Sequence, residues 1–349
     1  LSPDSAGIVI YRPQDTAVIA SSAEDIVSLL ASSRPEPLDQ LPPRDPPVVT
    51  RPDSPPRLVT VETGVSVFRT QNGMPVLVRP KAGAAIAHVA VHAVGGVRDE
   101  SAATAGLTTL AMRSSIKGTA TRTAAQIAED IEMLGASIGT SVGGESFGWS
   151  ISVPVQHLEA AVEILVDIVQ DAVIPEDAME TERSMALSDL SAMRDDMFRY
   201  PMRLVMKGAY GDHPYARSPL GNEASLRAAN VEDVRQWYRT RLLGSQFVVG
   251  VVGDVEAADA AEITARLLDG LQPVKQPAID APSWPQGETI SVESREKAQT
   301  ALAMAFEGPS REDDRRFAAQ LVATIASGLG GRFFDELRDR QSLAYTVHA

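Results

Sequence analysis

The chain has 349 residues, enough for two sizeable hydrophobic cores, and it is 44% hydrophobic but only 5% aromatic. The net charge of −14, from 46 acidic and 32 basic side chains, argues against a nucleic-acid surface, which needs clustered lysine and arginine. The sequence has no cysteine, which excludes disulfides, thiolate zinc sites and cysteine nucleophiles. No apolar run reaches the roughly 18–20 residues of a membrane span.

The first sixty residues predict a short folded piece followed by a linker. Residues 7–12 (GIVIYR) form a β-rich run, and residues 22–30 (SAEDIVSLL) combine a serine cap, early acidic residues and an apolar stripe, which predicts a helix. Prolines then recur through residues 31–57, and proline does not fit a helix interior or a central strand. We therefore expect residues 1–30 to be the tail of a preceding domain and residues 31–60 to be an extended, proline-rich linker. The opening LSPDSAG, without Met or a basic segment, is typical of a fragment or a processed chain.

A first complete domain is predicted over residues 61–272. Asn72 and Gly73 lie between two β-rich runs within residues 65–79, and Asn-Gly is the strongest short signal for a hairpin. In the remainder of the domain, predicted strands are interspersed with predicted helices. Strands are predicted at residues 85–94, 137–142, 147–153 and 247–253, and helices at 103–115, 123–134, 158–172, 175–193, 203–210, 231–239 and 257–268. This mixture predicts an α+β fold, in which a mixed, mainly antiparallel sheet packs against helices.

A second break falls at residues 273–287 (PVKQPAIDAPSWPQG), which predicts another linker. Beyond it, predicted strands at residues 289–292 and 301–306 precede a predicted helix at residues 315–327. This order repeats that of the first domain, so residues 288–349 are expected to begin an incomplete second domain of similar architecture. Because that copy is too short to close a sheet of its own, we expect the chain to be truncated.

The stretch GLTTLAMRSSIKGT, residues 106–119, resembles the metal-binding helix of a known peptidase family. The family is that of the inverted-zincin metallopeptidases, which includes insulinase, pitrilysin and the mitochondrial processing peptidase. Its motif is His-x-x-Glu-His followed by Lys-Gly-Thr. The two histidines lie four residues apart on one helical face and hold Zn²⁺, and the glutamate beside them is the general base.

The resemblance assigns four residues of this chain to a degenerate zinc site. With Lys-Gly-Thr aligned at residues 117–119, Thr109, Met112 and Arg113 stand where the family has His, Glu and His, and Asp189 falls near the last carboxylate ligand. Threonine is a poor zinc ligand, methionine cannot accept a proton, and arginine repels a cation. We therefore expect no metal site in this chain. We also expect Arg113 to take the electrostatic place of the metal by pairing with Asp189.

The resemblance extends from about residue 65 to the end of the chain. GDHPYARSPLG at residues 211–221 resembles the His-Pro-Tyr loop of the family, and FVVGVVGDVE resembles the strand that closes the domain. Residues 328–349 (GLGGRFFDELRDRQSLAYTVHA) resemble a glycine-rich loop and an Arg…Leu-x-Tyr segment that reaches toward substrate from the non-catalytic half. The resemblance thereby implies Arg338 and Tyr345 as substrate-binding residues. Arginine binds carbonyls and carboxylates through its fork of donors, and a tyrosine hydroxyl can donate to an oxyanion.

Family members work as two similar halves around a chamber, and one half often lacks the zinc motif. The resemblance therefore implies that this chain is the non-catalytic half of a two-half zinc metallopeptidase and is inactive alone. Zinc is expected in a partner half with His-x-x-Glu-His, on the same polypeptide or on a separate subunit, and peptides are the implied substrates. The resemblance suggests the bacterial periplasm as the compartment. Two alternatives stay open: a structural core-type subunit, and a peptide-binding module without a catalytic role.

Several residues have plainer interpretations beside these. His88 and His92 lie on a predicted strand, where four residues span roughly 13 Å, so we do not expect them to chelate one metal ion. The acidic residues at 180–182 are expected to lie on a solvated helix face. Arg338 has the alternative of being an ordinary solvated helix residue.

Overall fold

The computed structural model describes residues 22–32, 54–272, 274, 277–296 and 298–348. It divides into two units, Leu1–Val48 and Val49–Ala349, which we describe separately. The strand expected at residues 7–12 and most of the proline-rich linker lie outside the described residues. In the first unit, helix α1 (Ala23–Ser32) confirms the predicted helix. The Ser22 hydroxyl accepts from the Asp25 backbone N–H at 3.1 Å, and the Asp25 carboxylate accepts from the Ser22 N–H at 3.0 Å, which is a reciprocal N-terminal cap.

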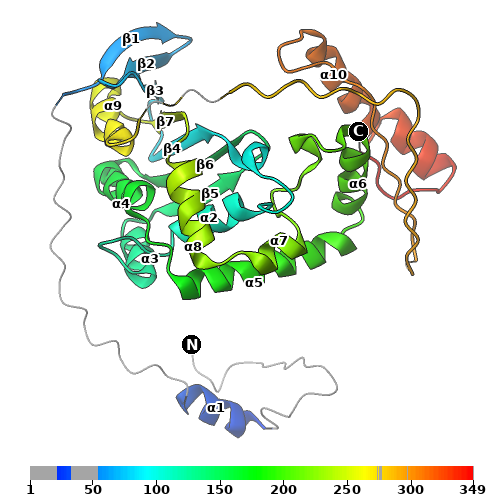
Figure 1. Ribbon diagram of the computed structural model, residues 1–349, viewed down its shortest axis with the longest axis horizontal. Coiled ribbons are helices and arrows are strands. Elements are labelled where there is room, and N and C mark those ends of the chain that lie inside the picture. The colour runs from blue at the N-terminus through cyan, green and yellow to red at the C-terminus, as the bar shows by residue number, and fades with distance from the viewer. Residues whose placement is uncertain (1–21, 33–53, 273, 275–276, 297, 349) are drawn as a thin grey trace. The chain divides into compact units, whose positions relative to one another are not determined.

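The second unit is built on a seven-stranded sheet with the strand order β1-β2-β3-β7-β4-β6-β5 (Figure 1). Neighbouring strands run antiparallel, except that β3 and β7 are parallel. The strands are β1 (Arg57–Glu62), β2 (Val65–Arg69), β3 (Pro75–Pro80), β4 (Ile86–Val94), β5 (Ser137–Val142), β6 (Ser146–Pro154) and β7 (Phe247–Gly253). The predicted mixed, mainly antiparallel sheet is confirmed. Strand β1 lies partly within the range predicted as linker, because the sheet begins directly after Pro56.

The turn between β2 and β3 is the predicted Asn-Gly hairpin. Gly73 has a φ of 85°, a conformation that residues with a side chain rarely adopt, while Asn72 keeps a negative φ. The Asn72 side chain instead donates to the Leu271 carbonyl at 2.9 Å. The asparagine therefore ties the hairpin to the far end of the same domain, a role that its turn propensity does not indicate.

Alternation along the central strands β4 and β7 gives the sheet one buried face. In β4, Ala87, Val89 and Val91 are fully buried, while His88 and His92 lie on the opposite, exposed face. Aromatic rings from β6 and β7, together with that of Tyr238 from the helical segment at residues 238–242, lie on the buried side. They meet edge to face, with centroid distances of 5.9 Å for Phe147–Trp149, 6.3 Å for Phe147–Phe247 and 6.2 Å for Trp149–Tyr238.

Helices cover this buried face, with α4 packed on β6 and α9 on β3 and β7 (Figure 1). The α-helices of this unit are α2 (Leu107–Ser115), α3 (Ala124–Met133), α4 (Leu158–Asp171), α5 (Glu176–Asp195), α6 (Arg199–Tyr210), α7 (Glu223–Ala228), α8 (Val231–Trp237), α9 (Ala257–Ala265) and α10 (Arg315–Ser327). The 3₁₀-helical segments are η2 (Gly96–Asp99), η3 (Val155–His157), η4 (Pro214–Ala216) and η6 (Arg266–Leu268), and the π-helical segments are η5 (Tyr238–Leu242) and η7 (Phe334–Arg340). Sheet against helices is the predicted α+β architecture.

Helix boundaries differ from the prediction mainly at the N-terminal ends. Helix α2 begins at Leu107, four residues later than expected, because residues 102–106 form turns. Helix α6 begins at Arg199, four residues earlier, and holds Pro201 in its first turn, where a missing N–H is tolerated. The six-residue α7 was not predicted.

The strands predicted at residues 289–292 and 301–306 are wrong. Both segments are extended chain that forms no ladder with a partner strand within the described residues, and Ile290 and Phe306 are each 81% exposed. A β-rich run needs a neighbouring strand for its backbone N–H and C=O groups. The helix predicted behind them is confirmed by α10, at the predicted residues 315–327, because a helix satisfies its own backbone.

Candidate functional site

Helix α2, which carries the three residues aligned with the zinc motif, is held in place at its N-terminus by a buried carboxylate. Glu100 is 3% exposed and accepts from the backbone N–H groups of Gly106 and Thr108, each at 2.9 Å. These are donors that the helix itself leaves unpaired. Burial raises the pKa of the Glu100 carboxyl above its ordinary value, and the two backbone donors oppose that shift.

Two buried indole groups fix α2 to the core. Trp237 donates from Nε1 to the Thr108 hydroxyl at 3.1 Å, and Trp149 donates to the Ser115 hydroxyl at 2.9 Å. Both bonds are buried, so the first and last turns of the helix are each held by a directional contact. The helix is therefore a rigid element on which side-chain positions are well defined.

The three residues aligned with the zinc motif have different surroundings. Thr109 is 6% exposed and donates its hydroxyl to the Pro219 carbonyl at 2.5 Å. Met112 is fully buried in the hydrophobic core. Thr109 and Arg113 line a cavity of about 550 Å³, and Met112 does not. At the three aligned positions, the Thr109 hydroxyl therefore donates to a backbone carbonyl, the Met112 thioether is buried in the core, and Arg113 is the only charged group.

The predicted pair between α2 and α5 is confirmed. Arg113 Nη1 donates to Asp189 Oδ2 at 3.0 Å, and the two side chains are 30% and 45% exposed. The guanidinium therefore neutralises the carboxylate that aligns near the last ligand of the family motif. An Arg–carboxylate contact of this length is a charge-assisted hydrogen bond.

The residues after α2 form a second ionic contact with α5. Lys117 Nζ lies 3.4 Å from Glu182 Oε1, and the Glu182 side chain is only 6% exposed. The expectation that Glu182 lies on a solvated face is wrong. It shares the buried face of α5 with Met179, Ala186 and Leu190, and this i, i+3, i+4 spacing is the signal in the sequence that would have found it.

The loop resembling His-Pro-Tyr packs directly against the start of α2. Gly221 has a φ of 75°, and a Cβ at this position would lie 2.4 Å from the Ala105 carbonyl oxygen. The Ser225 hydroxyl, one helical turn further on, donates to that same carbonyl at 2.5 Å. The close approach, which glycine alone permits, brings Pro219 within reach of Thr109.

Arg338 and Tyr345, the predicted substrate-binding residues, lie together. Arg338 is on η7, and its guanidinium carbon lies 4.8 Å from the centroid of the Tyr345 ring and 4.3 Å from that of Phe334. Tyr345 is 80% exposed. The guanidinium lies near both aromatic rings, an arrangement typical of a cation–π contact, and the Arg338 side chain is 36% exposed. Their role toward a substrate stays a prediction.

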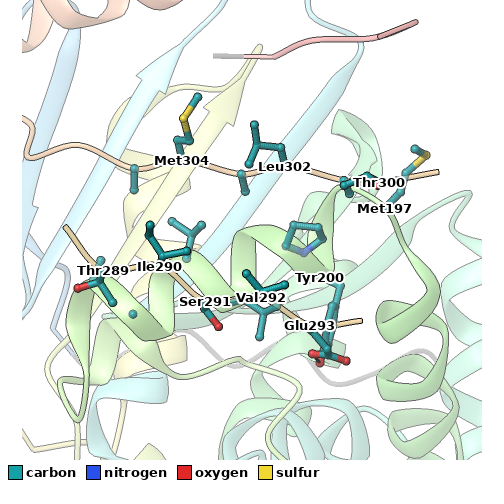
Figure 2. A pocket seen from close by; sticks show the side chains of 18 of the residues that line it. Met197, Tyr200, Thr289, Ile290, Ser291, Val292, Glu293, Thr300, Leu302 and Met304 are labelled. Atoms are coloured by element: carbon teal, nitrogen blue, oxygen red, sulfur yellow. Dashed lines mark hydrogen bonds between the residues drawn. The ribbon is translucent and has the colours of Figure 1, made fainter. Parts of the chain in front are cut away.

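A larger cavity, of about 1190 Å³, lies between α6 and two extended segments at residues 287–295 and 298–307 (Figure 2). Figure 2 shows Tyr200 from α6 beside the segment that carries Ile290 and Glu293. The Tyr200 hydroxyl donates to Glu293 at 2.8 Å, and the Arg295 guanidinium carbon lies 4.2 Å from the centroid of the tyrosine ring. None of the residues that the sequence assigned to a site lines this cavity.

Within residues 22–32 and the described parts of 54–348, no three His, Cys, Asp or Glu side chains are grouped so that they could hold a metal ion. His88, on the exposed face of β4, lies 2.9 Å from the Ser152 hydroxyl through Nδ1. In the same described parts, no helix has both the length and the hydropathy to cross a membrane.

Comparisons with known proteins agree with this fold. Residues 76–223 match the family model for insulinase, peptidase family M16, and residues 228–349 match the model for the peptidase M16 inactive domain. The two matches follow one another and leave only the first 75 residues and a short gap uncovered. The chain belongs to the insulinase family.

Curated relatives bear the name of zinc proteases. An uncharacterized zinc protease of Mycobacterium leprae is 27% identical over 260 residues, covering 73% of this chain and 58% of the relative. One from Streptomyces coelicolor is 25% identical over 263 residues, covering 73% and 57%. This chain therefore spans less than two thirds of the length of these relatives.

Solved structures support the fold. A peptidase M16 inactive domain from Pseudomonas fluorescens superposes with a TM-score of 0.66 at 21% identity, covering 81% of this chain and 70% of that one. A protease from Helicobacter pylori gives 0.67 at 17% identity, with the same coverage. Pitrilysin gives 0.56 at 19% identity over 66% of this chain and 26% of that one. At these identities the likeness concerns the fold alone.

Proposed function

We propose that this chain is the non-catalytic half of a two-half zinc metallopeptidase. It forms part of the chamber wall and contributes Arg338 and Tyr345 to substrate binding, while peptide hydrolysis takes place at zinc in the other half. We further propose that residues 61–272 form its complete peptidase-like domain and that residues 288–349 begin the next one. The proposal rests on membership in the insulinase family and on the chemistry of helix α2.

The Arg113–Asp189 pair is the observation that carries the proposal. The family motif needs two imidazoles, a carboxylate base and a further carboxylate around one cation. Here a guanidinium at one histidine position contacts the carboxylate near the last ligand position at 3.0 Å. Metal binding would require that contact to break and the Arg113 charge to move away. This domain has the helix, but the Arg113 guanidinium stands at one of the metal-ligand positions. Such a replacement is what we expect of a non-catalytic half.

Arg338 and Tyr345 give the supporting half a direct role. The stacked pair presents a tyrosine that is 80% exposed, so its hydroxyl can reach a partner outside this chain. A tyrosine hydroxyl that donates to the oxyanion formed during peptide hydrolysis stabilises the transition state more than the ground state. The arginine can bind a substrate carbonyl or carboxylate in both states. The two residues are therefore expected to affect different kinetic constants.

The test is a kinetic comparison in the complete assembly, with this chain joined or mixed with its His-x-x-Glu-His half. Tyr345→Phe should lower kcat by roughly a hundred- to a thousandfold, the usual effect of losing one oxyanion donor, while folding is unchanged. Arg338→Ala should chiefly raise KM. Arg340→Ala is the matched control for the arginine, because Arg340 lies on the same short helix, is 66% exposed and pairs with Glu336. Tyr210→Phe is the control for the tyrosine.

Three results would contradict the proposal. Unchanged kinetics in both Tyr345→Phe and Arg338→Ala would remove the substrate role and leave a structural subunit. A native assembly that contains this chain but no zinc-motif half, and that hydrolyses no peptide, would favour a binding module without a catalytic role. One zinc ion per chain, bound tightly at residues 109–113 in elemental analysis of the isolated chain, would refute the assignment of this half as non-catalytic.

A further inference from the structure

The cavity beside the degenerate zinc site is lined by four arginines and by no other charged side chain. It is formed by α2, β5, the end of α5, α6 and residues 215–220. The arginines are Arg113, Arg199, Arg203 and Arg217. The chain as a whole carries a net charge of −14. A cavity whose charged lining residues are all cationic therefore has the opposite sign of charge from the chain as a whole.

Two of the four arginines are already held by the protein. Arg113 pairs with Asp189. Arg217 donates to the backbone carbonyls of Glu100 and Asp212. Because these acceptors are neutral, they do not neutralise the positive charge of the guanidinium. These contacts fix the position of the two guanidinium groups without using all of their donors.

The other two arginines lie on the first turns of α6. Arg203 Nη1 is buried and has no hydrogen-bond partner within the described residues. Burial lowers the pKa of Arg203, and the nearby charge of Arg194 adds to that effect. Arg199 is exposed, and the Asp196 carboxylate before the helix accepts from the backbone N–H groups of Phe198 and Arg199. A guanidinium held partly out of water without an acceptor is costly unless an acceptor reaches it.

The rest of the lining is apolar or hydroxylic. Methionines from α5 and α6 form one wall, and the hydroxyl groups of Thr109 and Tyr215 already donate, to Pro219 and to Glu145. Apolar walls lower the local dielectric constant and so strengthen the attraction between a guanidinium and an anion. A volume of about 550 Å³ is within the range of small-ligand pockets and has room for one or two amino-acid residues.

We propose that this cavity is a carboxylate-binding subsite for peptides, in which Arg203, assisted by Arg199, receives an acidic side chain or a C-terminal carboxylate. The planar fork of arginine matches the two oxygens of a carboxylate. Flexible methionine side chains suit neighbouring side chains of varied shape. The inference rests on the proposed function in one respect only, that peptides are the ligands. This subsite includes Thr109 and Arg113, two of the residues aligned with the metal site of the family.

The proposal is tested by calorimetric titration of the complete chain with four probes. Three are blocked pentapeptides of one sequence: one with a central Glu and a C-terminal amide, one with Gln and the amide, and one with Gln and a free C-terminal carboxylate. The fourth is inorganic phosphate. At least one carboxylate-bearing peptide should bind about tenfold to a hundredfold more tightly than the uncharged one, the range expected for a charged hydrogen bond. The two carboxylate peptides distinguish a side-chain site from a C-terminal site.

Variants connect that binding to the cavity. Arg203→Gln should remove the preference for the carboxylate, and Arg203→Lys should retain part of it, because the charge stays while the fork is lost. Arg227→Gln is the matched control, since Arg227 is 64% exposed on α7, pairs with Glu223 and lies outside the cavity. If Arg203→Gln fails to fold by circular dichroism, Arg199→Gln at an exposed position takes its place and should also weaken binding.

Equal binding of all three peptides would overturn the proposal, as would unchanged binding in the folded arginine variant. Binding of phosphate with no binding of either carboxylate peptide would also overturn it. These titrations need no catalytic half. Their failure would leave the kinetic roles proposed for Arg338 and Tyr345 untouched, and unchanged kinetics at those residues would leave a positive titration standing.

Discussion

Replacing Glu163 by Gln should destabilise the domain far more than the same change in an exposed ion pair. Glu163 lies on α4 and Arg266 on η6, and the two side chains are 10% and 8% exposed. Both terminal nitrogens of the Arg266 guanidinium donate to the Glu163 carboxylate, Nη1 to Oε1 and Nη2 to Oε2, the latter at 2.9 Å. The pair joins the helix that covers β6 to the end of the helix that covers β3 and β7.

The size of the expected loss in unfolding free energy follows from the burial of this ion pair. Removing one partner of a buried ion pair leaves the other charge without full compensation and costs about 3–5 kcal/mol. An exposed pair contributes about 0–1 kcal/mol, because water solvates both groups and salt screens them. Glu232 and Arg239 form such a pair, at 63% and 59% exposure and 2.6 Å. Glu232→Gln is therefore the matched control, with an expected cost below 1 kcal/mol.

The assay is urea unfolding of the complete chain, arranged as a double-mutant cycle. Glu163→Gln and Arg266→Met should each cost about 3–5 kcal/mol, and the double variant should cost clearly less than their sum, because the second change removes the charge that the first left behind. Strict additivity would show that the pair does not act as a unit. A cost for Glu163→Gln no larger than that of Glu232→Gln would refute the argument from burial.

Two further predictions concern helix α2 and its surroundings. Asp189→Asn should lower the free energy of unfolding by less than about 1 kcal/mol, because the Arg113–Asp189 pair is partly exposed; a loss of several kcal/mol in urea unfolding would mean that the pair is a structural element of the core. Met112→Ala should cost about 2–5 kcal/mol, the usual cost of truncating a large buried side chain, because Met112 is fully buried. Met133→Ala, at a position that is 80% exposed, is its control, and equal melting temperatures for the two variants would contradict the placement of Met112 in the core.

The sequence alone determined most of the local structure. Strand alternation at residues 85–94 and 147–153 and the helical spacing in residues 158–172 are properties of neighbouring residues, and each produced the expected element. The degenerate motif in residues 106–119 likewise predicts that residues 109 and 113 lie on one face of a helix, because residues four apart on a helix share a face in any surroundings. That spacing, together with the family resemblance that places Asp189 near the last carboxylate ligand, predicts the contact between Arg113 and Asp189, which the structure contains.

Tertiary structure decided what depends on distant partners. The β-rich segments at residues 289–292 and 301–306 have strand-like sequences but no strand to pair with in the described chain, so local propensity did not settle their state. Glu182 is buried because α5 turns that face toward Lys117 and the core. The charge of the arginine-lined cavity arises only where α2, α6 and the loop at residues 215–220 converge, since its four arginines are up to 104 positions apart in the chain. Burial and charge at a site are sums over such convergent elements, and a linear sequence does not state which elements converge.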